Sequence, residues 1–119
     1  MADHPWVREF PGAITVCDEQ GTIIELNDKA VEAYQEQGGR RLIGTDLLAC
    51  HPEPARTKLR QLMETRQANV YTIEKDGWRK LIYHAPWYRD GHYRGFVELV
   101  LEIPAAIPHF VRDRRPESA

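Results

Sequence analysis

Histidine and cysteine are the side chains of this sequence that could bind a metal or act as nucleophiles. Cys50 and His51 stand side by side before a proline-rich segment, and a neutral imidazole is a common ligand of haem iron and other metals. Cys17 is far from them in sequence, and no second Cys/His pair follows at zinc-finger spacing. We therefore predict no metal site and expect both thiols to be reduced and mostly buried.

Short motifs of the common enzyme classes are missing from the sequence. It contains no G-x-S-x-G, H-E-x-x-H, phosphate-binding loop or dinucleotide glycine pattern. The other histidines are isolated, at a terminus, in a predicted strand, in a turn and in the tail: His4, His84, His92 and His109. We predict that the protein is not an enzyme.

Local sequence signals predict the elements that must position these residues. A first helix begins at Asn27 or Asp28, which cap its first turn, and ends before Gly38. Apolar residues at helical spacing, among them Leu59 and Met63, predict a longer helix over residues 53–66. β-branched and alternating runs predict five strands, at residues 13–17, 22–26, 69–75, 78–85 and 93–103. The fold class is therefore α+β: a five-stranded antiparallel sheet with helices inserted between strands 2 and 3.

Alternation along the last two strands indicates which face of the sheet is buried. The odd-numbered residues of the fourth strand form its more apolar face: Leu81, Tyr83 and Ala85. We expect this face to turn toward the helices, which places His84 on the outer surface. In the last strand, apolar residues that include Leu99 alternate with Glu98 and Glu102.

Length and composition limit the classes of function. A chain of 119 residues and 13.8 kDa has room for one compact domain. Its net charge of −2 and pI near 6.2 give no broad basic surface, so we expect no nucleic acid as main partner. No apolar run approaches the roughly 20 residues that cross a bilayer, and no signal peptide is recognisable. We expect a cytoplasmic protein that does not bind membranes.

Several short motifs, in this order, resemble those of a PAS domain. They are the turn segment Asp18–Ile23, Asn27 with Ala30, the step Ile43–Leu47, the turn Asp90-Gly91 and the segment Tyr93–Phe96. The resemblance covers the domain at residues 11–104, flanked by an N-terminal extension at 1–10 and a C-terminal tail at 105–119. Cys50-His51-Pro52 and the closing hairpin also resemble the PAS-like segment of DUF438-type proteins.

The resemblance implies a cupped sheet that binds a small ligand between the sheet and the helices. We expect a free-standing sensory module of bacterial-type signalling, which relays ligand binding through a dimer or a separate signalling protein. The residues that we expect to line the pocket are His51, Leu59, Met63, Tyr34, Tyr83 and Leu99. We predict dimerisation through the outer sheet face, at Trp78, Phe96 and Val100.

Two alternatives remain open at this point. One is a haem- or metal-binding redox or gas sensor that uses His51 as ligand, with Cys50 or Met63 opposite. The other is an interaction module that dimerises without a ligand. Flavin photochemistry is disfavoured, because nothing around Cys17 or Cys50 resembles the Asn-Cys signature of flavin photoreceptors.

Overall fold

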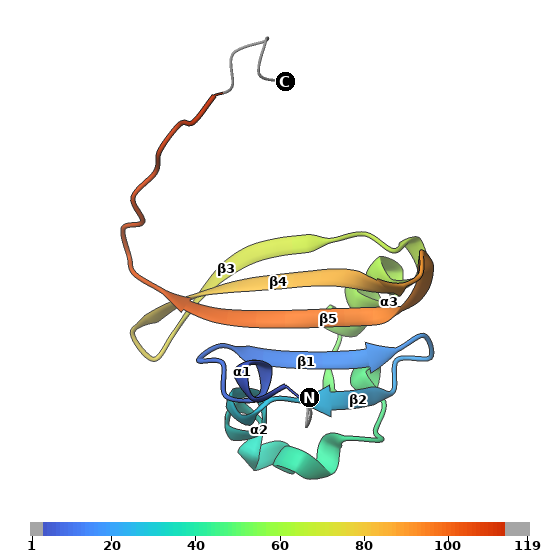
Figure 1. Ribbon diagram of the computed structural model, residues 1–119. Helices are drawn as coiled ribbons and strands as arrows, with labels where there is room; N and C mark the ends of the chain where they lie inside the picture. Colours follow the sequence, from blue (N-terminus) through green and yellow to red (C-terminus); the bar gives the residue numbers. More distant parts are fainter. Residues whose placement is uncertain (1–3, 114–119) are drawn as a thin grey trace.

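The sheet of this chain has five antiparallel strands in the order β2-β1-β5-β4-β3 (Figure 1). The computed structural model describes residues 4–113, without the side chain of Cys50. The strands are β1 (Ala13–Asp18), β2 (Ile23–Leu26), β3 (Asn69–Lys75), β4 (Trp78–Arg89) and β5 (His92–Ile103). The predicted fold class is confirmed, although β4 is longer than expected and runs on to the turn at Asp90-Gly91.

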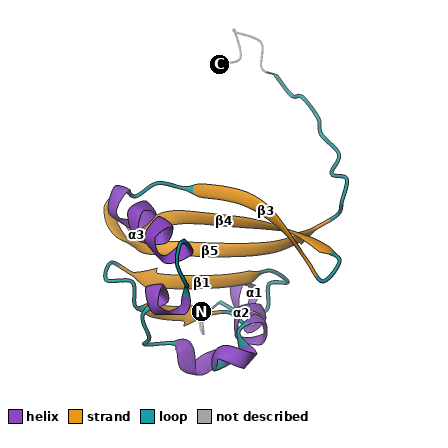
Figure 2. Cartoon of the chain, turned by 180° about the vertical axis from the view of Figure 1, so that it is seen from behind, coloured by secondary structure: helices purple, strands orange, loops and turns teal. Residues whose placement is uncertain are grey.

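Helical elements fill the chain between β2 and β3 (Figure 2). They are α2 (Asp28–Ala33), the 3₁₀ turns η1 (Gln35–Gln37), η2 (Gly39–Leu42) and η3 (Leu47–Cys50), and α3 (Ala55–Thr65). A short helix α1 (Pro5–Arg8) precedes β1. Both views place α2 near β1 and β2 and α3 near one end of β4 and β5. Within residues 4–113, no helix is both long and apolar enough to cross a membrane.

Asn27 holds the entry to α2 against the sheet. Its side chain is fully buried, and its Oδ1 accepts hydrogen bonds from the backbone N–H groups of Ile14 (2.9 Å) and Ala30 (3.1 Å). Its Nδ2 donates to the carbonyl oxygens of Gly12 (2.8 Å) and Val7 (3.2 Å). One side chain therefore caps the helix and joins it to the start of β1, which explains an asparagine at this position.

Gly95 permits the close approach of β5 to β1. Its φ is +147°, and a Cβ atom there would collide with the carbonyl oxygen of Cys17. The same carbonyl accepts a hydrogen bond of 3.0 Å from the indole N–H of Trp87 on β4. Only glycine fits such a contact without moving the backbone.

The sheet face that packs against the helical segment is the opposite of the one predicted. Ala13, Thr15 and Cys17 of β1 are buried, and side chains of directly paired residues project to the same side of a sheet. Thr15 pairs with Glu98 of β5, and Glu98 pairs with His84 of β4. Up to the register shift after Trp87, the even-numbered residues of β4 and their partners on β5 therefore face inward.

This register corrects the expected positions of five residues. His84, expected on the outer surface, is only 8% exposed, and Phe96, expected in the dimer face, is only 3% exposed. Val100 packs on the inner side against the core around Ala13. Tyr83, expected to face the helices, is 41% exposed on the outer side, and Leu99, which pairs with it, lies on that side as well.

Partly exposed apolar side chains form the outer face of the sheet. It carries residues of the central strands and their neighbours: Ile14, Val16, Leu81, Tyr83, Val97, Leu99 and Leu101. The two core clusters lie on the inner side, one around Ala30 and Leu26, the other formed by Cys17, Leu62 and Phe96.

Candidate functional site

A row of polar side chains crosses the inner face of the sheet. Thr15, Glu98 and His84 occupy adjacent positions on β1, β5 and β4. Glu98 Oε2 lies 2.6 Å from His84 Nε2, and Glu98 Oε1 accepts a hydrogen bond of 2.7 Å from the hydroxyl of Tyr34, the residue that follows α2. The Glu98 carboxylate therefore joins β5 to β4 and to the residue that follows α2, and Thr15 lies beside it on β1.

The surroundings of Glu98 favour its anionic form. Its side chain is 13% exposed and that of His84 is 10% exposed. Burial raises the pKa of Glu98, but the hydrogen bond and charge of His84, together with the Tyr34 hydroxyl, outweigh it and hold the pKa below its ordinary value of 4.5. A buried carboxylate is stable here because both of its oxygens have partners.

Two polar atoms of the same row have no partner among the described residues. They are the Thr15 hydroxyl oxygen and His84 Nδ1, and both are fully buried. Thr15 itself is only 3% exposed. Buried polar atoms are nearly always hydrogen-bonded, so an unpartnered pair in one row indicates a place for a bound molecule or water.

A cavity of about 100 Å³ lies against Thr15, between the sheet and the segment from α2 to η3. Its lining comes from β1, β2 and the helical segment: Thr15, Ile23, Tyr34, Gln37, Leu42, Leu47 and His51. His51 Nδ1 lies 2.9 Å from the carbonyl oxygen of Leu47, which can only accept, so this nitrogen carries the proton. In the neutral ring Nε2 is then an acceptor.

The cavity brings together two of the six residues expected to line a pocket, Tyr34 and His51. Leu59 is 4% exposed, as a core residue is, and Met63 lines a separate groove. Tyr83 and Leu99 lie on the outer face, as described above. The Cys50 side chain lies outside the described structure, and within residues 4–113 no group of three or more His, Cys, Asp and Glu side chains could hold a metal ion.

Thr15, Glu98 and His84 were not predicted as site residues. Glu98 was expected on the polar side of an alternating strand, and His84 on the outer surface of the sheet. The residue types could have indicated this pair. An acid and a histidine that lie opposite each other on neighbouring strands can form a hydrogen-bonded pair, and such a pair can be buried. The sequence alone does not give that register.

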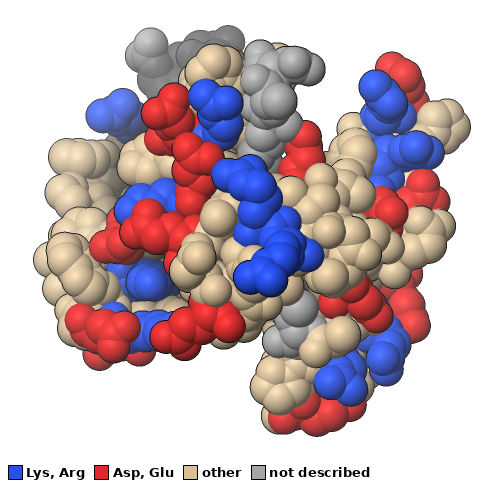
Figure 3. Space-filling view, turned by 90° about the horizontal axis from the view of Figure 1, so that it is seen from below, with Lys and Arg blue, Asp and Glu red and all other residues tan. Residues whose placement is uncertain are grey.

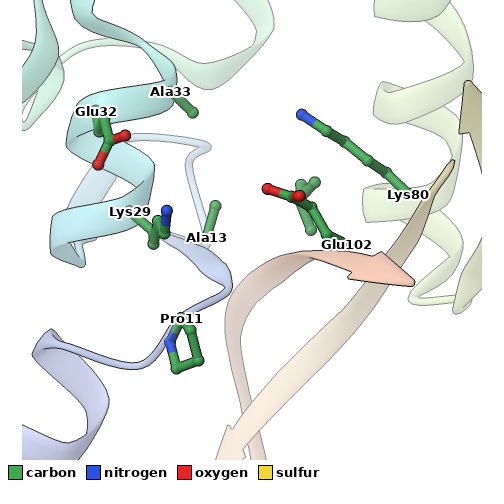
Figure 4. A pocket seen from close by; sticks show the side chains of 8 residues that line it. Pro11, Ala13, Lys29, Glu32, Ala33, Lys80 and Glu102 are labelled. Atoms are coloured by element: carbon green, nitrogen blue, oxygen red, sulfur yellow. The ribbon is translucent and has the colours of Figure 1, made fainter. Parts of the chain in front are cut away.

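Other depressions among the described residues are more open and are lined by charged side chains, and two of them are the following. In the first, of about 180 Å³, Lys80 and Glu102 extend from the sheet toward Lys29 and Glu32 of α2 (Figure 4). The second, of about 420 Å³, contains Met63 and has Arg66 stacked 4.3 Å above the ring of Tyr93.

Acidic and basic side chains are also interspersed on the face seen from below (Figure 3). Mixed, solvated charges of this kind are typical of an ordinary protein surface. The cavity beside Thr15, which has a buried and unpartnered hydroxyl on its wall, is therefore the candidate site.

Solved structures with the same fold come from several bacterial proteins. A C-terminal domain from Streptococcus mutans superposes with a TM-score of 0.67 at 18% identity, over 81% of this chain and 78% of that chain. The Aer2 receptor from Vibrio cholerae, described as a dual PAS-heme oxygen sensor, gives 0.58 at 14% identity, over 78% and 95%. The VqmA dimer of Vibrio cholerae gives 0.61 at 16% identity, over 92% of this chain and 56% of that chain.

Sequence comparison gives the family. No curated protein matches the chain significantly. The family model described as the PAS fold, by contrast, matches residues 7–103, nearly all of the described structure. Together with the five-stranded sheet and the helical segment between its second and third strands, this match shows that the chain belongs to the PAS fold family.

Proposed function

We propose that this chain is a sensory signalling module that binds a small molecule in the cavity beside Thr15. The observation that carries the proposal is a buried hydroxyl without a partner among the described residues, on the wall of a cavity between the sheet and the helical segment. If this position served only to fill the core, an apolar side chain would be expected, because a buried hydroxyl that makes no hydrogen bond is costly. Membership of the PAS fold family supports a sensory role, since the similar Aer2 receptor is described as an oxygen sensor.

The cavity is positioned to transmit binding to the sheet. Tyr34 lines the cavity, and its hydroxyl donates a hydrogen bond to Glu98 of β5. The next residue of β5, Leu99, lies on the outer face of the sheet. A ligand that binds one conformation of Tyr34 more tightly than another increases the population of the first. The resulting change in the conformational equilibrium of β5 can be no larger than this difference in binding affinity.

Native mass spectrometry of the freshly purified protein, compared with its denatured mass, tests ligand binding directly. We expect an added mass that survives gentle ionisation and disappears on denaturation. The Thr15→Val variant keeps the shape of the side chain without the hydroxyl, so it should lose most of the added mass. The exposed Thr72 of β3 provides the matched control, Thr72→Val, which should keep it. Protein that carries no added mass, either as purified or after incubation with cell extract, would contradict ligand binding.

We propose that the signal is read through the outer face of the sheet, in a homodimer or with a separate signalling protein. The predicted dimer residues need revision, because Phe96 is buried and Val100 faces the core; only Trp78, 58% exposed, remains accessible. The partly exposed apolar residues of the outer face, Val97, Leu99 and Leu101, are better candidates. The similar VqmA structure is described as a dimer.

Sedimentation velocity at several protein concentrations tests the dimer. Leu99→Glu should produce a folded monomer, because it places a charge in the centre of the apolar face. Gln61→Glu adds the same charge at an exposed position of α3, on the inner side of the sheet; it serves as the control and should leave the association unchanged. A wild-type protein that stays monomeric at every concentration would exclude the homodimer and leave a separate signalling protein as the partner.

A ligand-free interaction module is the second candidate function, and the apolar outer face favours it. The two candidates give different results: the module without a ligand keeps its dimer in Thr15→Val and never carries an added mass. Haem binding through His51 is disfavoured, because a cavity of about 100 Å³ is far smaller than the roughly 300–1,000 Å³ pockets that hold drug-sized ligands. Absence of a Soret band after haem supplementation would exclude it.

A further inference from the structure

The polar groups around the cavity beside Thr15 limit the chemistry of the molecule that fits there. This inference rests on the proposed function, since it concerns the ligand of the same cavity. Three properties of the cavity matter: its charge, its hydrogen-bonding groups and its size. Each is given by contacts of described residues.

Charge is the first limit. Among the described residues, the lining contains no lysine, arginine, aspartate or glutamate, and His51 is its histidine. The carboxylate of Glu98, which lies beside Thr15 and Tyr34, already has both oxygens bonded, to His84 and to Tyr34. An anion would lie close to this negative charge with only the His51 imidazole to offset it, and a cation would have to share a carboxylate that already has two partners. Either ion would lose its hydration for an incomplete counter-charge, which is expensive inside a protein.

Hydrogen bonding is the second limit. The Thr15 hydroxyl is unpartnered and can both donate and accept. His51 donates through Nδ1 to the carbonyl oxygen of Leu47, so Nε2 of the neutral ring accepts. A ligand that satisfies both groups carries a donor for His51 and a polar atom for Thr15. The rest of its surface meets apolar side chains: Ile23, Leu42 and Leu47.

Size is the third limit. An apolar cavity of roughly 150 Å³ accommodates benzene, so one of about 100 Å³ holds roughly four to six non-hydrogen atoms. We propose that the ligand is a small uncharged molecule with a hydrogen-bond donor and an acceptor on a compact apolar frame, such as a small nitrogen heterocycle, held between the Thr15 hydroxyl and the His51 imidazole.

Titrations followed by amide NMR of the full chain test this assignment with four probes. Pyrazole is uncharged and carries both a donor and an acceptor; furan has a similar shape and no donor; acetate and methylammonium carry the two charges. We expect pyrazole to shift the amide signals of Thr15, Leu47 and His51 saturably, with a dissociation constant on the order of millimolar, as for any ligand of this size. Furan should bind at least about tenfold more weakly, and neither ion should shift these signals.

Substitution of the two polar groups provides the second arm. Thr15→Val should weaken pyrazole binding by about tenfold and leave furan binding unchanged, because only the hydroxyl is removed. His51→Gln tests the other contact and replaces the Thr15 variant if that variant fails to fold. Thr72→Val is the matched control.

The outcomes separate this inference from the proposed function. Tighter binding of acetate or methylammonium at the same amides would overturn the uncharged class and keep the cavity as a ligand site. Equal binding of pyrazole and furan, or equal binding by wild type and Thr15→Val, would overturn the role of the two polar groups alone. No shift at these amides with any of the four probes would overturn both the ligand class and the cavity as a binding site.

Discussion

The two faces of the same sheet treat polar and apolar side chains differently from what alternation along the strands predicts. The inner face buries a carboxylate and an imidazole, with side chains that are 13% and 10% exposed. The outer face leaves Tyr83 41% exposed and Leu99 partly exposed. Glu98 and Leu99 are neighbours in sequence, so the difference comes from the partners that each meets.

The comparison teaches that a polar group is buried when its partners are buried with it. Glu98 is satisfied by His84 from a neighbouring strand and by Tyr34 from the helical segment. Within residues 4–113, Tyr83 at the centre of the outer face stays 41% exposed, so apolar surface there is accessible to solvent. The partners that a side chain meets, more than its polarity, therefore decide which face buries it.

Replacing the buried acid should have the largest effect. Glu98→Leu leaves His84 and Tyr34 without their common acceptor in a buried position, so we expect a loss of about 3 kcal/mol in the free energy of unfolding. Urea denaturation followed by circular dichroism measures it. An unchanged or increased stability would show that Glu98 faces solvent and that the inner and outer faces are exchanged.

The coupling between Glu98 and His84 should be the next largest effect. If the two side chains stabilise each other directly, the double variant Glu98→Leu/His84→Leu should be less destabilised than the sum of the single variants, by about 2 kcal/mol. The same urea experiment on all four proteins gives this value. Additive losses would mean that the pair does not form in solution.

Acid should weaken the inner face selectively. The pKa of Glu98 is lower in the folded protein than its ordinary value of 4.5, so its contribution to stability is complete above about pH 4.5 and is lost as the pH falls below that value. Wild type should therefore lose stability more steeply than Glu98→Gln in this range. Glu102→Gln, an exposed position of the same strand, is the control and should follow the wild type. Parallel profiles for wild type and Glu98→Gln would contradict the lowered pKa.

Charging the outer face should have the smallest effect on the folded chain. Leu99→Glu places a carboxylate where water can reach it, so we expect less than about 1 kcal/mol of destabilisation at concentrations where the protein is monomeric. The urea midpoint of the monomer measures this. A collapse of stability comparable to that of Glu98→Leu would indicate that Leu99 belongs to the core.

Most of the architecture could be predicted from the sequence because it depends on local signals. Asp18 and Gly21 form the first turn, Asn27 caps α2, and the spacing of Leu59 and Leu62 gives a helix with one buried face. These signals act over a few residues, where turn geometry, capping and periodicity decide the outcome. These signals predicted the five strands and the helices that lie between the second and third strands.

The candidate site could be predicted only in part. His51 stands out in the sequence as a possible ligand residue and does line the cavity, as does Tyr34. Thr15 gives no signal of its own, because a threonine in a strand is ordinary; its hydroxyl matters only when the strand is buried. Leu99 and Tyr83 were assigned to the pocket because the apolar side of an alternating strand normally faces the core.

The sequence by itself determined which segments become strands and helices and where the turns lie. Only the tertiary structure decided which side of β4 and β5 is buried, because alternation defines two faces without saying which one the helices cover. The pairing of β5 with β1 and β4 places Glu98 between Thr15 and His84. Tyr34, from the helical segment, donates a hydrogen bond to the carboxylate and so allows this face to be buried. Burial of a charge depends on partners that are distant in sequence, and these come together only in the folded chain.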